Sequence, residues 1–205
     1  MIKNIIFDIG NVLADFRWKE FLIEKGFDES IAQRIGGATV NTPTWAELDR
    51  GVWSFEQLME GFIANDPEIA GQIRDGFADM SGMVTIKDYA CKWIQELKAR
   101  GFQVYYLSNF SRKVEVECAD SLAFIPLMDG GILSYREQLV KPDAAIYLLL
   151  LERYGLKPRE CIFLDDTGVN IEAANALGIH GIVFESKEQA MRDMEQIISG
   201  NKCWQ

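Results

Sequence analysis

The chain has 205 residues, of which 48% are hydrophobic and 25% are charged, so it can bury a core and is not an intrinsically disordered protein. Its 21 Lys and Arg and 31 Asp and Glu give a net charge of −10, which argues against nucleic acid or an anionic membrane as a partner. The single histidine, His180, excludes a metal site made of several histidines, and no apolar run approaches the roughly 20 residues of a membrane-spanning helix.

The cysteines and the first residues both favour a cytoplasmic protein. The four cysteines are widely spaced without a CxxC pair, as expected of free thiols in a reducing compartment: Cys91, Cys118, Cys161 and Cys203. Asp8 also stands where a signal peptide needs its apolar stretch. We therefore expect a cytoplasmic location.

The first predicted element is a short buried strand at residues 5–7, which ends at Asp8 and turns at Gly10 and Asn11. From residue 16 to 82 the chain is polar, with apolar residues at helical spacing. We predict four or five short helices in this segment and no strand, including a helix near residues 55–62 with Ser54 as its N-cap.

From residue 83 onward, predicted helices and strands alternate. The first helix has Thr85 as its cap and Gly101 as its stop, and another begins near Ser111. A third follows Lys141, with Pro142 at its first position and Gly155 beyond its end. The remaining predictions are strands at residues 104–107, 161–164 and 182–184, a helix ending near residue 178 and a last helix ending near residue 199.

Alternating helices and continuously apolar strands predict an α/β fold with a doubly wound, mostly parallel, Rossmann-like sheet. We expect residues 1–15 and 83–205 to form this core and residues 16–82 to form an inserted α-helical cap.

Three predicted strands end in polar side chains. Asp8 follows the first, Ser108 and Asn109 follow the second, and Asp165 and Asp166 follow a later one. Turn chemistry alone explains any one of these. Because ligands bind outside the carboxyl ends of the strands in such sheets, three together predict one shared site.

The acidic residues predict a magnesium site. Asp165, Asp166 and Asp8 would repel one another, and a hard cation with oxygen ligands relieves that repulsion. The alternative is an exposed acidic pair in which Asp166 or Thr167 caps the next helix. Magnesium in turn suits a phosphate-bearing substrate.

The remaining polar residues predict a phosphate clamp. Lys141 would place a positive charge near a helix N-terminus, while Ser108 and Asn109 add a hydroxyl and an amide. Asp8 would then be free to attack phosphorus and form an aspartyl phosphate.

These residues resemble the haloacid dehalogenase-like (HAD) superfamily of phosphohydrolases, and the insertion resembles that family's helical C1 cap. The resemblance covers nearly the whole chain, and the first motif is similar to that of the α-D-glucose-1-phosphate phosphatase branch. It rests on four motifs in the family's order: residues 7–13 (FDIGNVL), Ser108-Asn109, Lys141-Pro142-Asp143, and residues 163–167 (FLDDT) with Asn170.

The resemblance implies a role for each of these residues. Asp8 would be the nucleophile and a Mg²⁺ ligand, and the backbone carbonyl of Gly10 a further ligand. Asp165 and Asp166 would hold the metal directly or through water. The phosphoryl group would be bound by Ser108 and Asn109 and neutralised by Lys141.

One position departs from the family's pattern. Most phosphatases of the family carry a second Asp two residues after the nucleophile, which acts as acid and base, but this chain has Gly10 there. Losing such a group costs about 10²–10⁴-fold in rate. The substrate could have a good leaving group, another carboxylate (Asp15, Glu47 or Asp49) could substitute, or turnover could be slow or absent.

The sequence therefore predicts a Mg²⁺-dependent phosphatase that acts on a small phosphorylated metabolite, with a sugar phosphate as one candidate, as a monomer or small homo-oligomer. One alternative is a catalytically weak or inactive binding or regulatory protein, because of Gly10. Another is a haloacid dehalogenase, although that chemistry needs no metal. A response-regulator receiver would carry its acidic pair after the first strand, and neither GxGxxG nor GxxxxGK[ST] is present.

Overall fold

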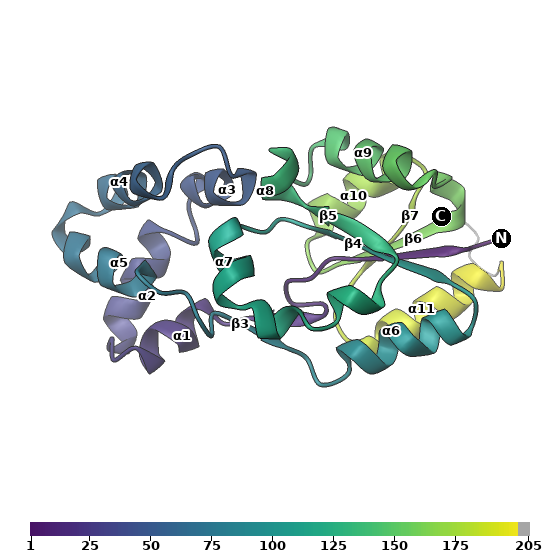
Figure 1. Ribbon diagram of the computed structural model, residues 1–205, viewed down its shortest axis with the longest axis horizontal. Helices are drawn as coiled ribbons and strands as arrows, with labels where there is room; N and C mark the ends of the chain where they lie inside the picture. Colours follow the sequence, from purple (N-terminus) through teal and green to yellow (C-terminus); the bar gives the residue numbers. More distant parts are fainter. Residues whose placement is uncertain (201–205) are drawn as a thin grey trace.

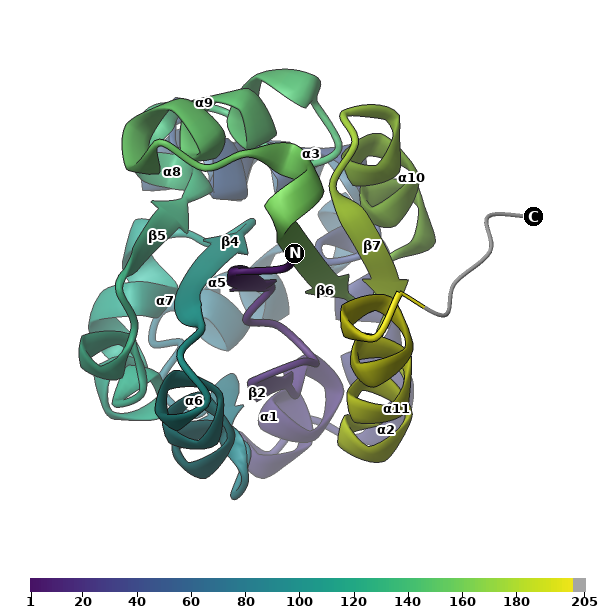
Figure 2. The ribbon, with the colours of Figure 1, turned by 90° about the vertical axis from the view of Figure 1, so that its right-hand side faces the viewer.

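The computed structural model describes residues 1–200; Cys203 and its neighbours lie outside the described residues. A five-stranded parallel sheet in the order β5-β4-β1-β6-β7 forms the centre (Figures 1 and 2). The strands are β1 (Asn4–Phe7), β4 (Gln103–Ser108), β5 (Gly130–Leu133), β6 (Cys161–Asp165) and β7 (His180–Val183).

Helices cover both faces of the sheet, as the predicted α/β fold requires. Successive residues of β1 point into opposite cores: Ile5 and Phe7 into one, Ile6 into the other. Figure 2 shows α6 and α11 on one side of the sheet and α9 and α10 on the other. Their bounds are α6 (Ala90–Ala99), α9 (Ala144–Tyr154), α10 (Gly168–Ala176) and α11 (Lys187–Ile198).

A helical lobe lies beyond one end of the sheet and is connected to it by a two-stranded antiparallel ribbon (Figure 1). The ribbon pairs β2 (Ala14–Phe16) with β3 (Val84–Ile86), at the two ends of the predicted insertion. Between them lie α1 (Trp18–Glu24), α2 (Glu29–Ala38), α3 (Pro43–Arg50), α4 (Phe55–Asn65), η1 (Pro67–Ile69) and α5 (Ala70–Phe77).

Several local predictions are confirmed. Ser54 caps α4 in a reciprocal capping box with Gln57, and Ser111 caps α7 (Arg112–Glu117). Gly155 ends α9 in the left-handed conformation, which suits a residue without a side chain. Among residues 1–200, Cys91, Cys118 and Cys161 are free thiols.

Two predicted helix starts are wrong. The residues after Met83 form β3 rather than a helix with Thr85 as its cap, because they pair with β2, and α6 begins only at Ala90. Pro142 is not in the first turn of α9, since the side chain of Asp143 accepts a hydrogen bond from Ala145 N–H and caps the helix there. Lys141 therefore lies in the loop before α9.

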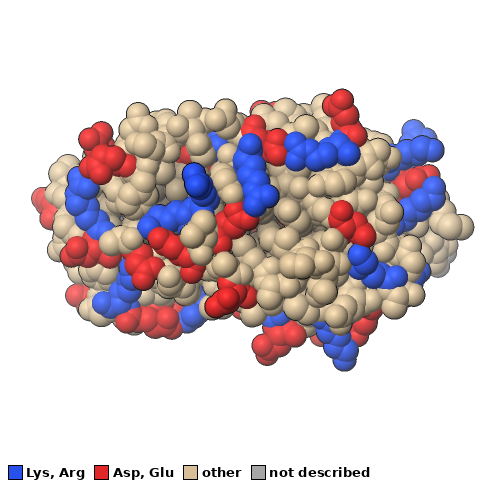
Figure 3. All heavy atoms as spheres, viewed as in Figure 1, with Lys and Arg blue, Asp and Glu red and all other residues tan. Residues whose placement is uncertain are grey.

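The sequence interpretation also missed two short consecutive elements at the edge of the sheet. These are the edge strand β5 and the helix α8 (Ser134–Glu137) that follows it. Along the described part of the chain, no helix has both the length and the apolar character needed to cross a bilayer. On the face in Figure 3, Lys and Arg lie interspersed with Asp and Glu rather than in one basic patch.

Candidate active site

The predicted polar residues meet where the central strands end. Because β1 lies between β4 and β6, Phe7 is in register with Tyr106 on one side and Leu164 on the other. The residues that follow in each strand therefore come together at one edge of the sheet. Asp8 takes its place there by donating its backbone N–H to the carbonyl of Leu164 at 2.8 Å.

Three carboxylates form a cluster at this edge. One oxygen from each of Asp8, Asp165 and Asp166 lies within 4.8 Å of the others. The Lys141 Nζ is 2.9 Å from Asp8 Oδ1 and 2.6 Å from Asp165 Oδ2. One ammonium cannot balance three carboxylates, so the cluster keeps negative charge that a divalent cation can neutralise.

Asp8 has the features of a nucleophile and of a metal ligand. Its Oδ1 is buried, and despite its closeness to Lys141 it has no aligned hydrogen-bond donor among the described residues. The pKa of Asp8 is raised to about 6: burial and the nearby Asp165 raise it, while Lys141 and the Ser108 hydroxyl lower it. A buried carboxylate oxygen without a donor fits a bound cation or an electrophile.

Asp165 is held rigidly by its neighbours. Its Oδ1 accepts hydrogen bonds from the Thr167 backbone N–H at 2.8 Å and from Asn170 Nδ2 at 3.1 Å. Its Oδ2 accepts from Lys141 Nζ at 2.6 Å and from Asn170 Nδ2 at 3.0 Å. With four hydrogen bonds from three donor groups on its two oxygens, Asp165 orients Lys141 and fits a metal contact through water.

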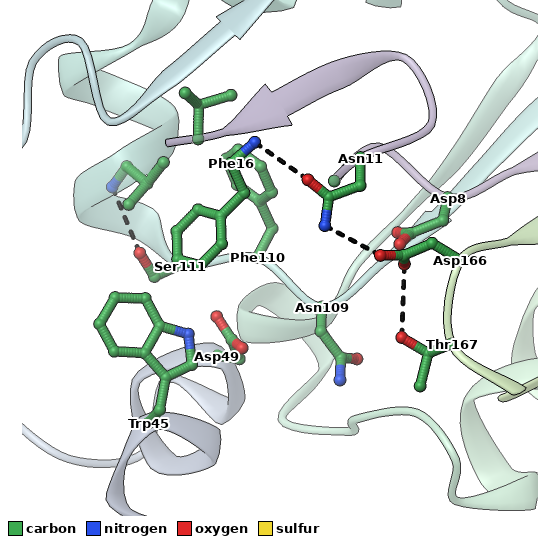
Figure 4. Close-up of a pocket in the computed structure, with 13 residues that line it drawn as sticks. Asp8, Asn11, Phe16, Trp45, Asp49, Asn109, Phe110, Ser111, Asp166 and Thr167 are labelled. Atoms are coloured by element: carbon green, nitrogen blue, oxygen red, sulfur yellow. Dashed lines mark hydrogen bonds between the residues drawn. The ribbon is translucent and has the colours of Figure 1, made fainter. Parts of the chain in front are cut away.

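Asp166 is more open. Its Oδ2 accepts a hydrogen bond from Asn11 Nδ2 at 2.8 Å and its Oδ1 one from Thr167 Oγ1 at 3.3 Å (Figure 4). Asn11 and Asp166 both line the cavity together with Asp8. The sequence interpretation quoted Asn11 and Asn170 within motifs but assigned no part to either side chain; each orients a carboxylate of the cluster.

Lys141 is buried and charged. Burial alone lowers the pKa of Lys141, but the carboxylates of Asp8 and Asp165 together hold it above its ordinary value. Its backbone is clamped by Asn109, whose Oδ1 accepts from the Lys141 N–H at 2.7 Å and whose Nδ2 donates to the Lys141 carbonyl at 3.0 Å. The Asn109 side chain thus positions Lys141, and its phosphate-binding role stays a prediction.

A cavity of about 200 Å³ opens next to this cluster (Figure 4). Gly10 lies on its wall, and a Cβ added there would meet no atom within 4 Å. Trp45 and Asp49, both from α3 of the helical lobe, line the cavity too. The remaining wall is largely aromatic or aliphatic: Phe16, Val84, Phe110 and Val114.

The structure also places the single histidine and two tryptophans relative to the site. His180 begins β7, at the end of the sheet opposite to the site, and its Nε2 lies 3.2 Å from the Arg159 carbonyl. It is therefore a structural residue. Trp45 packs in the core of the helical lobe, with its ring centroid 6.0 Å from that of Phe62, and also lines the cavity, whereas Trp53 is 40% exposed.

Comparison with known proteins identifies the family. The model of the haloacid dehalogenase-like hydrolases matches residues 2–178, and the chain belongs to this family. The chain is 35% identical to a mouse protein, acyl-CoA dehydrogenase family member 10, over 96% of its own length but only 19% of the mouse protein. It is 24% identical to the sesquiterpene phosphatase astK of Aspergillus oryzae, with 96% of each chain covered.

A solved structure shows the same fold. The HAD family enzyme bt-2542 of Bacteroides thetaiotaomicron, in complex with magnesium and inorganic phosphate, superposes with a TM-score of 0.67 at 22% identity, over 94% of this chain and 100% of that one.

Proposed function

We propose that this protein is a Mg²⁺-dependent phosphatase that hydrolyses a small phosphomonoester through a phospho-aspartate on Asp8. The observation that carries the proposal is Asp8, which lines the cavity and whose buried Oδ1 lies 2.9 Å from Lys141 Nζ without an aligned hydrogen-bond donor among the described residues. The phosphatase activity of astK and the magnesium and phosphate bound by bt-2542 support the same chemistry.

The residues divide the work as follows. Asp8 attacks phosphorus, Lys141 and the Ser108 hydroxyl offset the charge of the incoming phosphoryl group, and Asn109 keeps Lys141 in place. Asp8, Asp166 and the Gly10 carbonyl would hold Mg²⁺, with Asp165 contributing directly or through water, and the ion would supply positive charge against the phosphoryl oxygens. The net negative charge of the cluster is the reason the site requires that cation.

The helical lobe is proposed to act as a cap that selects the substrate. Trp45 and Asp49 close the cavity from the α3 side, and Phe16 lies on the ribbon that leads into the lobe. A cavity of about 200 Å³ with such walls suits a small leaving group. The link to sugar phosphates stays a prediction, as do the cytoplasmic location and the state of assembly.

A panel of phosphomonoesters assayed with Mg²⁺ and with a chelator tests the proposal. The panel contains anomeric and primary sugar phosphates, aryl phosphates and flat heterocyclic phosphates. We expect Mg²⁺-dependent phosphate release that is lost in Asp8→Asn, with the fold of the variant unchanged by circular dichroism.

Other outcomes of this panel would support the competing interpretations. No release from any monoester would favour a binding or regulatory protein disabled at Gly10. In a parallel assay with a haloacid as substrate, turnover that persists with the chelator would favour dehalogenation.

A further inference from the structure

The position two residues after the nucleophile leaves a gap in the proposed reaction. Gly10 has no group that could protonate a leaving alcohol or take a proton from water. Three other carboxylates were candidates from the sequence: Asp15, Glu47 and Asp49. The structure separates them, and the inference below rests on the proposed phosphatase function.

Two of the three are unsuited to the role. The carboxylate of Asp15 is paired with Lys87 and its side chain is 49% exposed. Glu47 lies 3.4 Å from Arg50 Nε on the same helix. Neither residue lines the cavity beside Asp8.

Asp49 points into that cavity. It lies near the end of α3, and its carboxylate faces the space between Trp45 and Asn109, across from Asp8 (Figure 4). Within residues 1–200 Asp49 has no ion pair, and its carboxylate accepts no hydrogen bond. No ion pair therefore holds the Asp49 side chain in its ionised form.

The backbone that carries Asp49 is fixed against the sheet domain. The Ser134 hydroxyl of α8 donates to the Asp49 carbonyl at 2.6 Å and accepts a hydrogen bond from the Phe110 backbone N–H at 2.9 Å. The end of α3 also lies close to α8, because a Cβ added at Gly51 would lie only 2.8 Å from the Tyr135 carbonyl oxygen. The Asp49 carboxylate is therefore held by a helix, α3, that packs against a second helix, α8, and not by a loop.

The charges around Asp49 allow both protonation states near neutrality. Burial and the negative charge of Asp8 raise the pKa of Asp49 to about 7, while Lys141 lowers it. On α8, which packs against α3, Arg136 and Glu137 are each paired elsewhere, with Glu115 and Arg153. Asp8 and Lys141 are thus the charged groups that act on it.

We propose that Asp49 is the proton donor and acceptor of the reaction, in place of the carboxylate missing at position 10. As Asp8 attacks, its oxygen bonds to phosphorus and the bond from phosphorus to the leaving oxygen breaks. The leaving oxygen keeps the electron pair, takes the proton of the Asp49 carboxyl and departs as an alcohol.

The second half of the cycle reverses the transfer. A water molecule gives one proton to the Asp49 carboxylate as its oxygen attacks phosphorus. The bond between phosphorus and Asp8 breaks, Asp8 regains its carboxylate and inorganic phosphate leaves. Asp49 is then protonated for the next cycle, so all atoms and charges balance.

Asp49→Asn tests the proposal with two substrates of similar size and different leaving groups. Benzyl phosphate releases a weakly acidic alcohol, which needs a proton, whereas p-nitrophenyl phosphate releases a stable phenolate. We expect kcat/KM for benzyl phosphate to fall at least about 10²-fold and that for p-nitrophenyl phosphate far less. Glu47→Gln, a carboxyl-to-amide change on the same helix outside the cavity, is the matched control and should leave both values unchanged.

A restoration experiment makes the test specific to proton transfer. Because a Cβ added at Gly10 would meet no atom within 4 Å, Gly10→Asp introduces a carboxyl at the position where the family pattern has it. In the Asp49→Asn background we expect it to regain at least tenfold in kcat/KM for benzyl phosphate. Melting temperatures establish that the variants are folded, and Asp49→Ala repeats the comparison if Asp49→Asn does not fold.

Three results would overturn the proposal. These are values for Asp49→Asn within about twofold of wild type, an equal loss for both substrates, or no gain from Gly10→Asp. A wild-type protein that is inactive on every phosphomonoester would instead remove the proposed function itself, so the two failures are distinguishable.

Discussion

Replacing Lys141 with methionine removes the only ammonium that the structure places within the acidic cluster. Lys141→Met keeps most of the volume of the stem but leaves Asp8 and Asp165 without the cation now 2.9 and 2.6 Å from their oxygens. Both carboxylates are buried, so water cannot replace the lost charge. We therefore expect a large decrease in the free energy of unfolding.

The expected size follows from burial and pH. Breaking a buried ion pair by removing one partner costs about 3–5 kcal/mol, because the other charge stays uncompensated. The pKa of Asp8 is already raised to about 6, so ionisation of Asp8 lowers the free energy of unfolding as the pH rises toward that value. Without Lys141 that pKa rises further, and the deficit of the variant grows from pH 5 to pH 8.

Urea unfolding at pH 5 and pH 8, with a chelator and with millimolar Mg²⁺, measures this deficit. The control is Lys98→Met, which removes a surface pair with Asp129 in which the side chains are 37% and 31% exposed. Such a pair is worth about 0–1 kcal/mol. We also expect Mg²⁺ to restore part of the stability of Lys141→Met, because it neutralises the same carboxylates.

Two results would refute the electrostatic reasoning. One is a loss for Lys141→Met no larger than that for Lys98→Met at pH 8. The other is a loss that is the same at pH 5 and pH 8.

Two further predictions concern Asp49 and the sheet edge. The pKa of Asp49 is about 7 in the folded protein and near 3.8 when unfolded, so ionisation of Asp49 lowers the free energy of unfolding between these pH values. Relative to the wild type, the free energy of unfolding of Asp49→Asn should therefore rise by at most ~1.4 kcal/mol per pH unit from pH 4 to 7 and then level off. A difference between the two proteins that is the same at every pH in urea unfolding would contradict this. A Cβ at Gly131 would lie 2.3 Å from the Tyr106 ring and 2.4 Å from its carbonyl oxygen, so Gly131→Ala should lower the melting temperature strongly, whereas Gly10→Ala, with open space around it, should change it little. Equal melting temperatures for these two variants would show that β5 does not pack as described.

The main sheet could be predicted because its strands carry their own signal. β1 and β6 are buried along their whole length, and apart from Asn4 their residues form apolar runs that lead directly into Asp8 and Asp165. The elements that were missed carry no such pattern. In β2 and β3 only one residue of three is buried, and both are defined by pairing with each other across the insertion. β5 begins with two glycines and forms at the sheet edge against Tyr106.

The acidic cluster could be predicted for a similar reason. Parallel strands bring their carboxyl ends together, so the predicted sheet already implies that Asp8 and Asp165 lie close to each other. The position of Asp49 depends instead on how α3 packs against α8, a contact between residues 85 apart in the chain. Local sequence therefore left Asp49 as one of three candidates, and only the packing of the helical lobe distinguishes it.

The central claim is that Asp8 carries phosphorus during turnover. The most direct measurement is to quench the wild-type protein in acid during turnover of p-nitrophenyl phosphate with Mg²⁺, reduce it with borohydride and locate the modified residue by peptide mass spectrometry. We predict reduction of an acyl phosphate at position 8 and none in Asp8→Asn. Phosphate release with position 8 unmodified, or with the modification at another residue, would contradict the account.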